Sequence, residues 1–216
     1  MNEADFWLQS SAVLLVLSSL ALLGTSRIAT GIRVLALQGV LVAIVVLVGL
    51  DGHIALRAVA LGLATLLLKG ALFPWLLVRA QRAAKVQEEL EPFVGYQFSL
   101  AGGVIALSVA VWLSHRLALP PAIDAKLLAV GFFMIFAGLL LLVSRRIAIG
   151  QVFGYVVMEN GIALFGLAVA QHEPLLIELA ILLDVFVAVF VMGIAIGHIN
   201  REFDHIDVDR MAALRD

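Results

Sequence analysis

The stretch DAKLLAVGFFMIFAGLLLLVS, residues 124–144, has only one charged residue, Lys126, after its initial aspartate. A helix needs about 20 mostly apolar residues to cross the roughly 30 Å hydrocarbon layer of a lipid bilayer. This stretch therefore predicts a transmembrane helix. Apolar runs of similar length recur on both sides of it along the chain.

The overall composition is typical of an integral membrane protein. Of the 216 residues, 63% are hydrophobic and 14% are charged, and the mean hydropathy is +1.10. Soluble domains are about half apolar and about a quarter charged. The net charge of −2 provides no basic surface for a phosphate backbone, so we expect no nucleic acid partner. The absence of cysteine excludes disulfides, thiolate metal ligands and iron–sulfur ligation.

Apolar runs between charged or proline-containing segments predict an all-α bundle of about seven transmembrane helices. No phosphate-binding glycine loop, nucleophile elbow or HExxH sequence occurs, so we expect no catalysis by this chain alone. The acidic start MNEADFW does not resemble a secretory signal, and the first helix is expected to be retained. The expected helices are residues 7–25, 30–50, 54–79, 94–115, 124–144, 148–170 and 175–199.

The orientation of the bundle follows from the distribution of lysine and arginine, because loops that cross the membrane are poor in them. One side is expected to hold only Arg57, Arg116 and Lys126. This asymmetry predicts an N-terminus outside and a C-terminus in the cytoplasm, which requires an odd number of spans. The side richer in cations would hold Arg27, Arg33, Arg79, Arg82, Lys85, Arg145, Arg146, Arg201, Arg210 and Arg215.

Residues 1–216 are expected to form one transmembrane domain with three parts. Residues 1–93 contain the first three helices and a cytoplasmic connector, and residues 94–123 contain a bridging fourth helix and an outer turn. Residues 124–216 contain a three-helix unit with a cytoplasmic tail. Pro120-Pro121 marks the outer turn, because two consecutive prolines cannot continue a helix.

Three ionisable residues, Lys69, Glu159 and Asp184, are expected near the middle of the membrane. Charges there cost about 2.5–3.5 kcal/mol each on insertion scales, and such residues generally serve a function. Glu159 and Asp184 lie at similar depths in the sixth and seventh expected helices. Burial disfavours a charged carboxylate, whereas a nearby lysine favours release of its proton. These residues predict a proton relay; the alternatives are a static interhelical ion pair and a protonated carboxyl that only hydrogen-bonds across the bundle.

Further polar residues are secondary candidates for the same site. Glu178 lies near the outer end of its helix and is either a rim residue or a point where protons gain access. Gln38 and Asn160 are expected to brace neighbouring helices or to bridge water. Pro74, five residues after Lys69, is expected to kink its helix. The five histidines form no metal-binding pattern, so we expect neither a metal nor a cofactor.

Two segments, Phe153-Gly154-Tyr155-Val156-Val157-Met158-Glu159-Asn160-Gly161 and Glu178-Leu179-Ala180-Ile181-Leu182-Leu183-Asp184, resemble component E of the hydrogenase-4 family. Members of that family are membrane subunits of complexes that couple a [NiFe] hydrogenase, often with formate dehydrogenase, to a complex-I-like membrane arm. The resemblance covers most of the chain, including Lys69 with Pro74.

The last three expected helices also resemble the K subunit of bacterial complex I, which contributes two membrane glutamates to a proton path. Here Glu159 and Asp184 lie one helical turn from the positions of those glutamates. Since residues three apart share one helical face, the two carboxylates can still face each other. This departure leaves the route of the proton open.

The resemblance implies a membrane-arm subunit without redox centres, which takes part in proton translocation coupled to electron transfer. It implies antiporter-like and complex-I-like membrane partners, and indirectly a [NiFe] hydrogenase-type peripheral arm. The expected location is a bacterial or archaeal cytoplasmic membrane, where the chain contacts the lipid bilayer. The alternatives are a subunit of a multisubunit cation/proton antiporter and a purely structural membrane subunit.

Overall fold

The computed structural model describes residues 3–49, 59, 62–83, 95–117 and 124–169, and this part of the chain is helical apart from short turns. Within it, six helical segments are long and apolar enough to cross a membrane. The prediction of an all-α, multi-span membrane protein is therefore confirmed for six spans. The seventh expected helix, residues 175–199, lies outside the described residues. The six segments are Glu3–Gly24, Ile28–Val48, Gly62–Arg79, Tyr96–Arg116, Ala125–Ser144 and Ile149–Val169.

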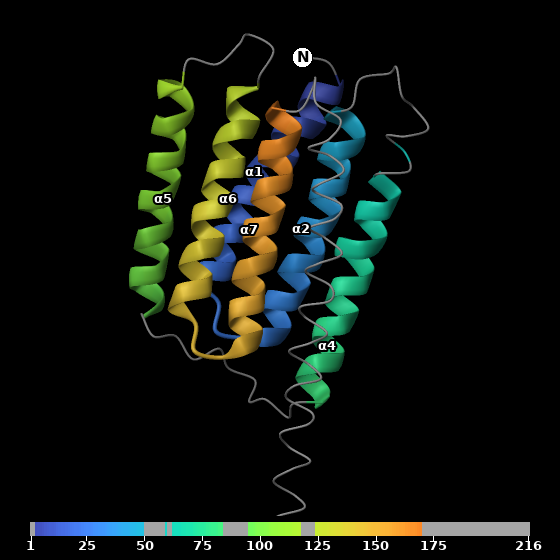
Figure 1. Cartoon of the computed structure of the whole chain (residues 1–216), viewed down its shortest axis with the longest axis vertical. Coiled ribbons are helices and arrows are strands. Elements are labelled where there is room, and N and C mark those ends of the chain that lie inside the picture. The colour runs from blue at the N-terminus through green and yellow to red at the C-terminus, as the bar shows by residue number, and fades with distance from the viewer. Residues whose placement is uncertain (1–2, 50–58, 60–61, 84–94, 118–123, 170–216) are drawn as a thin grey trace, which may run out of the picture.

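The described spans run alternately up and down through the bundle (Figure 1). Helices α1, α4 and α6 end at the same end of the bundle at which α2, α5 and α7 begin. The third span is composite, because a π-helical segment, η2, leads directly into α4. The helices are α1 (Glu3–Gly24), α2 (Ile28–Gly49), η2 (Leu66–Leu72), α4 (Phe73–Ala83), α5 (Tyr96–Arg116), α6 (Ala125–Ser144) and α7 (Ala148–Val169).

Five of the helices stand in a row in the order α5, α6, α7, α2 and α4, and α1 lies behind them (Figure 1). Helix α1 packs against α2, α5 and α6. Helices α6 and α7 are the most buried spans, whereas α5 at the edge of the row is the least buried. Within the described bundle, α6 and α7 therefore present the smallest share of their residues to the surroundings.

Four glycines set the close packing of α6 against α7. An added Cβ atom at Gly138 would collide with backbone atoms of Gly154 and Met158, and one at Gly154 would collide with Gly138 and Leu142. Two turns along each helix, Gly131 and Gly161 repeat this relationship. Small residues at such spacing let membrane helices approach until their backbones touch. The contact fixes the height of α7, and hence of its polar residues, in the bundle.

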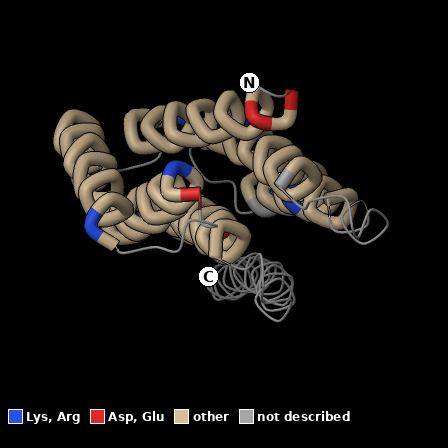
Figure 2. The backbone as a smooth tube through the Cα atoms, turned by 90° about the horizontal axis from the view of Figure 1, so that it is seen from above, with Lys and Arg blue, Asp and Glu red and all other residues tan. Residues whose placement is uncertain are grey.

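Charged residues are rare along the helices and lie mainly at their ends (Figure 2). Arg79 lies over the ring of Trp75 at 5.6 Å, and Arg116 lies over Trp112 at 5.5 Å. These pairs lie near opposite ends of the bundle, as α4 ends where α5 begins. Tryptophan with a neighbouring cation is typical of membrane–water interfaces. The two pairs therefore mark the expected edges of the membrane.

Arg145, which follows α6, is buried with 1% of its surface exposed. Its Nη2 donates to the carbonyl oxygens of Leu23 at 2.9 Å and Leu22 at 3.3 Å, in the last turn of α1. The guanidinium also lies over the ring of Tyr96, at the start of α5, at 5.1 Å. Burial lowers the pKa of Arg145 from its ordinary value, and Tyr96 opposes this by raising it. A cation at a helix C-terminus satisfies free carbonyls and complements the helix dipole.

Candidate functional site

A buried cluster of three polar residues connects η2 to α7 through the side chain of Lys69. Lys69 Nζ donates to Glu159 Oε1 at 2.6 Å and to Asn160 Oδ1 at 3.0 Å. The exposed fractions are 3% for Lys69, 1% for Glu159 and 0% for Asn160. Lys69 and Glu159 form an ion pair that is closed off from the surface. A buried pair of opposite charges that are also hydrogen-bonded avoids the cost of an isolated charge in an apolar interior.

The π-helical turn positions Lys69. Pro74 has no backbone N–H, and its ring would collide with the carbonyl four residues earlier in a regular helix. Instead, the N–H of Phe73 bonds to the carbonyl of Leu68, five residues back, and Leu66–Leu72 widen into a π-helix. Such widened turns often occur at functional sites. The structure thus shows a change of helix type just before Pro74, and the kink expected there stays a prediction.

Gly39 of α2 allows the backbone of η2 to approach. An added Cβ atom at Gly39 would lie 2.5 Å from the carbonyl carbon of Lys69 and 2.8 Å from the backbone nitrogen of Gly70. Any side chain larger than hydrogen would therefore push η2 away from α2. Since Lys69 reaches past α2 toward α7, this close approach helps bring its Nζ to Glu159.

A second buried polar cluster joins α2 to α1. Gln38 is fully buried, and its Nε2 lies 3.0 Å from the Oγ atoms of both Ser18 and Ser19. Both serine hydroxyls donate to the carbonyl oxygen of Leu15, at 2.9 and 2.8 Å. Gln38 thus links α2 to α1 through hydrogen bonds.

The sequence-derived candidates separate into two groups. Lys69, Glu159 and Asn160 lie together, and Gln38 is buried on the neighbouring helix. Asp184 and Glu178 lie outside the described residues, so the expected pairing of Glu159 with Asp184 stays a prediction.

Sequence reasoning did not single out Ser18, Ser19 or the burial of Arg145. Two consecutive serines within an apolar run are a weak signal for a polar contact between helices. Arg145 adjoins a second arginine, Arg146, in the turn between two spans, and so resembles an ordinary loop cation. Only contacts from α1 and α5 distinguish Arg145, which is buried, from Arg146, which is exposed.

The fold and the cluster define a multi-pass membrane protein with ionisable groups in its interior. The chain is 33% identical over 207 residues to uncharacterized protein Rv0085 of Mycobacterium tuberculosis (strain ATCC 25618 / H37Rv), an alignment that covers 94% of this chain and 93% of that protein. The chain belongs to the family of that protein. No family model and no solved structure matches this chain.

The chain is also similar to hydrogenase-4 component E over part of its length. It is 38% identical over 91 residues to the proteins of that name from Escherichia coli (strain K12) and Shigella flexneri. The alignment covers 42% of this chain and 41% of those relatives, so the chain matches about two fifths of their length. This partial match supports the resemblance to component E that the motifs around Glu159 suggested.

Proposed function

We propose that this chain is a membrane-arm subunit of a hydrogenase-4-like, complex-I-related respiratory complex, and that it takes part in proton translocation coupled to electron transfer. The redox centres belong to partner subunits. The observation that carries the proposal is the buried ion pair of Lys69 and Glu159 at 2.6 Å. The partial match to hydrogenase-4 component E supports the class of complex.

The energetics of buried ion pairs favour a functional role for Lys69 and Glu159. Replacing such a pair by well-packed apolar residues is often neutral or even stabilising, because removing two charges from water is costly. Stability alone therefore gives little reason to keep both residues in the interior of a membrane bundle. Ionisable residues within transmembrane segments commonly belong to ion or proton pathways.

The short hydrogen bond gives the pair two neutral forms. When Lys69 is an ammonium and Glu159 a carboxylate, moving one proton from Nζ to Oε1 produces an amine and a carboxylic acid without net charge. Neither form leaves an uncompensated charge in the apolar interior. In the proposed mechanism, Glu159 then passes the proton to Asp184 on the next expected helix. A new proton then reaches Lys69 from the side of the Lys69 nitrogen that faces away from Glu159.

Asn160 holds the lysine in place during this exchange. Its Oδ1 accepts a hydrogen bond from Lys69 Nζ at 3.0 Å, and an amide of asparagine does not titrate. It therefore fixes the position of Nζ whether or not Glu159 is ionised. Because Glu159 and Asn160 are adjacent, Lys69 Nζ donates to one acceptor that titrates and to one that does not.

The test is donor-driven proton translocation in membrane vesicles that contain the assembled complex, with hydrogen and formate tried in turn as electron donors. Glu159→Gln and Asp184→Asn retain side-chain size and hydrogen bonding but remove the titrating group. With subunit content unchanged, we expect translocation to fall by about 10²-fold or more, the lower range for loss of a proton-transfer group. Glu3→Gln, at an exposed carboxylate, is the matched control and should translocate protons normally.

Two results would redirect the proposal. If both variants assemble and translocate protons like the wild type, the two carboxylates have a structural role. If proton movement in the wild type follows an imposed sodium gradient and ignores every electron donor, the chain belongs to a cation/proton antiporter.

A further inference from the structure

The orientation of the Gln38 amide is fixed by its neighbours on α1. The hydroxyl hydrogens of Ser18 and Ser19 are both donated to the Leu15 carbonyl, so these hydroxyls can only accept from Gln38. The nitrogen Nε2 must therefore face the serines, and it uses both of its hydrogens there. The amide oxygen, Oε1, is buried and has no hydrogen-bond partner in the part of the chain that the structure describes.

The Asn160 amide is fixed in the same way by the lysine. As an ammonium, Lys69 Nζ can only donate, so the atom facing it must be the amide oxygen, Oδ1. This leaves the amide nitrogen, Nδ2, directed elsewhere. It is buried and, among the described residues, lacks an acceptor. Gln38 thus presents an acceptor in need of a donor, and Asn160 a donor in need of an acceptor.

The register of α2 against α7 brings these two amides to the same level. Both helices start at the same end of the bundle and run in the same direction (Figure 1). Near that end, Gly31 of α2 contacts the ring of Phe153 of α7. Seven residues further along each helix, about 10 Å higher and on the same helical face, are Gln38 and Asn160.

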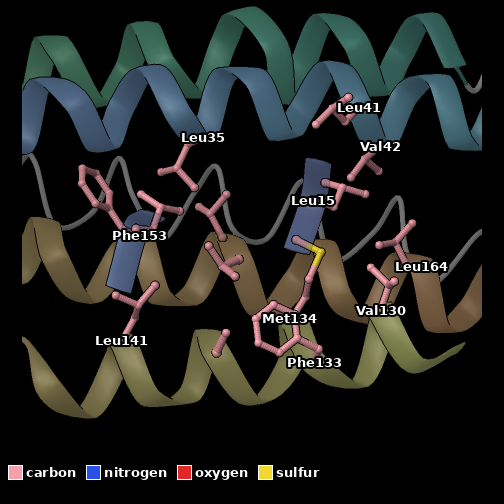
Figure 3. Packing of buried hydrophobic residues seen from close by; sticks show 14 of the residues in the cluster. Leu15, Leu35, Leu41, Val42, Val130, Phe133, Met134, Leu141, Phe153 and Leu164 are labelled. Carbon is pink, nitrogen blue, oxygen red and sulfur yellow. The ribbon is translucent and has the colours of Figure 1, made fainter. Parts of the chain in front are cut away.

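The close-up of the core agrees with this register. Leu35 and Val42 of α2, on either side of Gln38 in the sequence, lie over the part of α7 between Phe153 and Leu164 (Figure 3). Glu159 and Asn160 belong to that same part of α7. The side chains of α2 and α7 therefore meet around the level of the two amides.

We propose that Gln38 and Asn160 hold a shared water molecule between α2 and α7. The water accepts a hydrogen bond from Asn160 Nδ2 and donates one to Gln38 Oε1. Buried polar groups in native proteins are nearly always satisfied, and buried water typically supplies the missing partner. A bridging water is almost as favourable in enthalpy as a direct hydrogen bond.

This water joins the two buried clusters into one polar chain across four helical segments. The chain runs from Lys69 on η2, through Asn160 on α7 and Gln38 on α2, to Ser18 and Ser19 on α1. Gln38 is then a positioning residue, because it holds Asn160, which in turn holds Lys69 Nζ. Its contribution to proton transfer rests on the proposed function, whereas the water site itself does not.

The water site can be tested by solid-state NMR on the full-length chain in lipid bilayers. The sequence contains three asparagines, Asn2, Asn160 and Asn200, so the double variant Asn2→Ser, Asn200→Ser leaves Asn160 as the single asparagine. With ¹⁵N in the asparagine side chain, magnetisation transfer from water protons to the Asn160 amide reports a bound water. We expect this transfer in the otherwise wild-type chain, and its loss after Gln38→Met.

Gln9→Met is the matched control, because Gln9 is an exposed glutamine on α1, and it should keep the transfer. Absence of transfer without any change at Gln38, or transfer that persists after Gln38→Met, would overturn the proposal. The measurement on the chain that keeps Gln38 needs no substitution there, so it tests the proposal even if Gln38→Met fails to fold. The proposed function is tested separately: normal proton translocation by Glu159→Gln would contradict it. That result would not change the magnetisation transfer from water to Asn160.

Discussion

Lys69 Nζ lies 2.6 Å from Glu159 Oε1, although 90 residues separate the two in the sequence. Removing one partner leaves the other buried without its counter-charge, which typically costs about 3–5 kcal/mol. We expect Lys69→Met to lower the free energy of unfolding of the chain in detergent by an amount of this order. The double variant Lys69→Met, Glu159→Gln should be closer to the wild type, because neither member of this pair is left charged without the other. A double variant as unstable as the sum of the single variants would show that the pair does not interact.

Two glycines on adjacent helices should respond oppositely to the same substitution. Alanine is the better helix former by about 1 kcal/mol, but a Cβ atom at Gly138 would collide with the backbone of α7. We expect Gly138→Ala to destabilise the chain by about 1–3 kcal/mol, as overpacking does. At Gly166, no atom of the described residues outside its own helix backbone lies within 4 Å of an added Cβ, so Gly166→Ala should be neutral or stabilising. Thermal unfolding in one detergent compares both, and equal effects would contradict the close α6–α7 contact.

Arg145 should be sensitive even to a substitution that keeps its charge. Lysine lacks the planar guanidinium that bonds the carbonyls of Leu22 and Leu23 and lies over Tyr96. Hydrogen bonds to charged groups contribute about 1.5–3 kcal/mol, and we expect Arg145→Lys to cost stability in that range. Arg33→Lys, at an exposed arginine near the start of α2, is the control and should unfold like the wild type. If the two variants behave alike, Arg145 does not tie α6 to α1 and α5.

The sidedness of the bundle can be read from single cysteines, because the natural chain has none. Arg82 and Arg116 lie near opposite ends of the described bundle, so cysteines at these positions should differ in accessibility. The distribution of cations predicts that Arg82→Cys faces the cytoplasm and Arg116→Cys faces outward. A maleimide that cannot cross membranes should therefore label only Arg116→Cys in intact cells. Labelling of Arg82→Cys instead would invert the predicted orientation.

The sequence alone determined the class of the protein and the location of its described spans. Length and hydrophobicity of a run are local properties, and they decide whether a helix can cross a bilayer. Six of the seven expected helices correspond to described spans, with boundaries that differ by a few residues except at the start of the third, residues 54–61, where only residue 59 is described. The ionisable residues Lys69 and Glu159 were also found locally, because a charge within an apolar run is conspicuous in any sequence.

The tertiary structure decided which of these residues meet. Their positions within the apolar runs place Lys69 and Glu159 at similar depths in the membrane, but depth does not specify which helices are neighbours. That is set by contacts between distant segments: the glycines that bring α6 and α7 together, and Gly39, which admits η2 against α2. The π-helical turn before Pro74 then determines the direction in which Lys69 points. Helix neighbours, and the partners of Lys69 and Gln38, follow from packing energy summed over many residues, which no single segment of sequence contains.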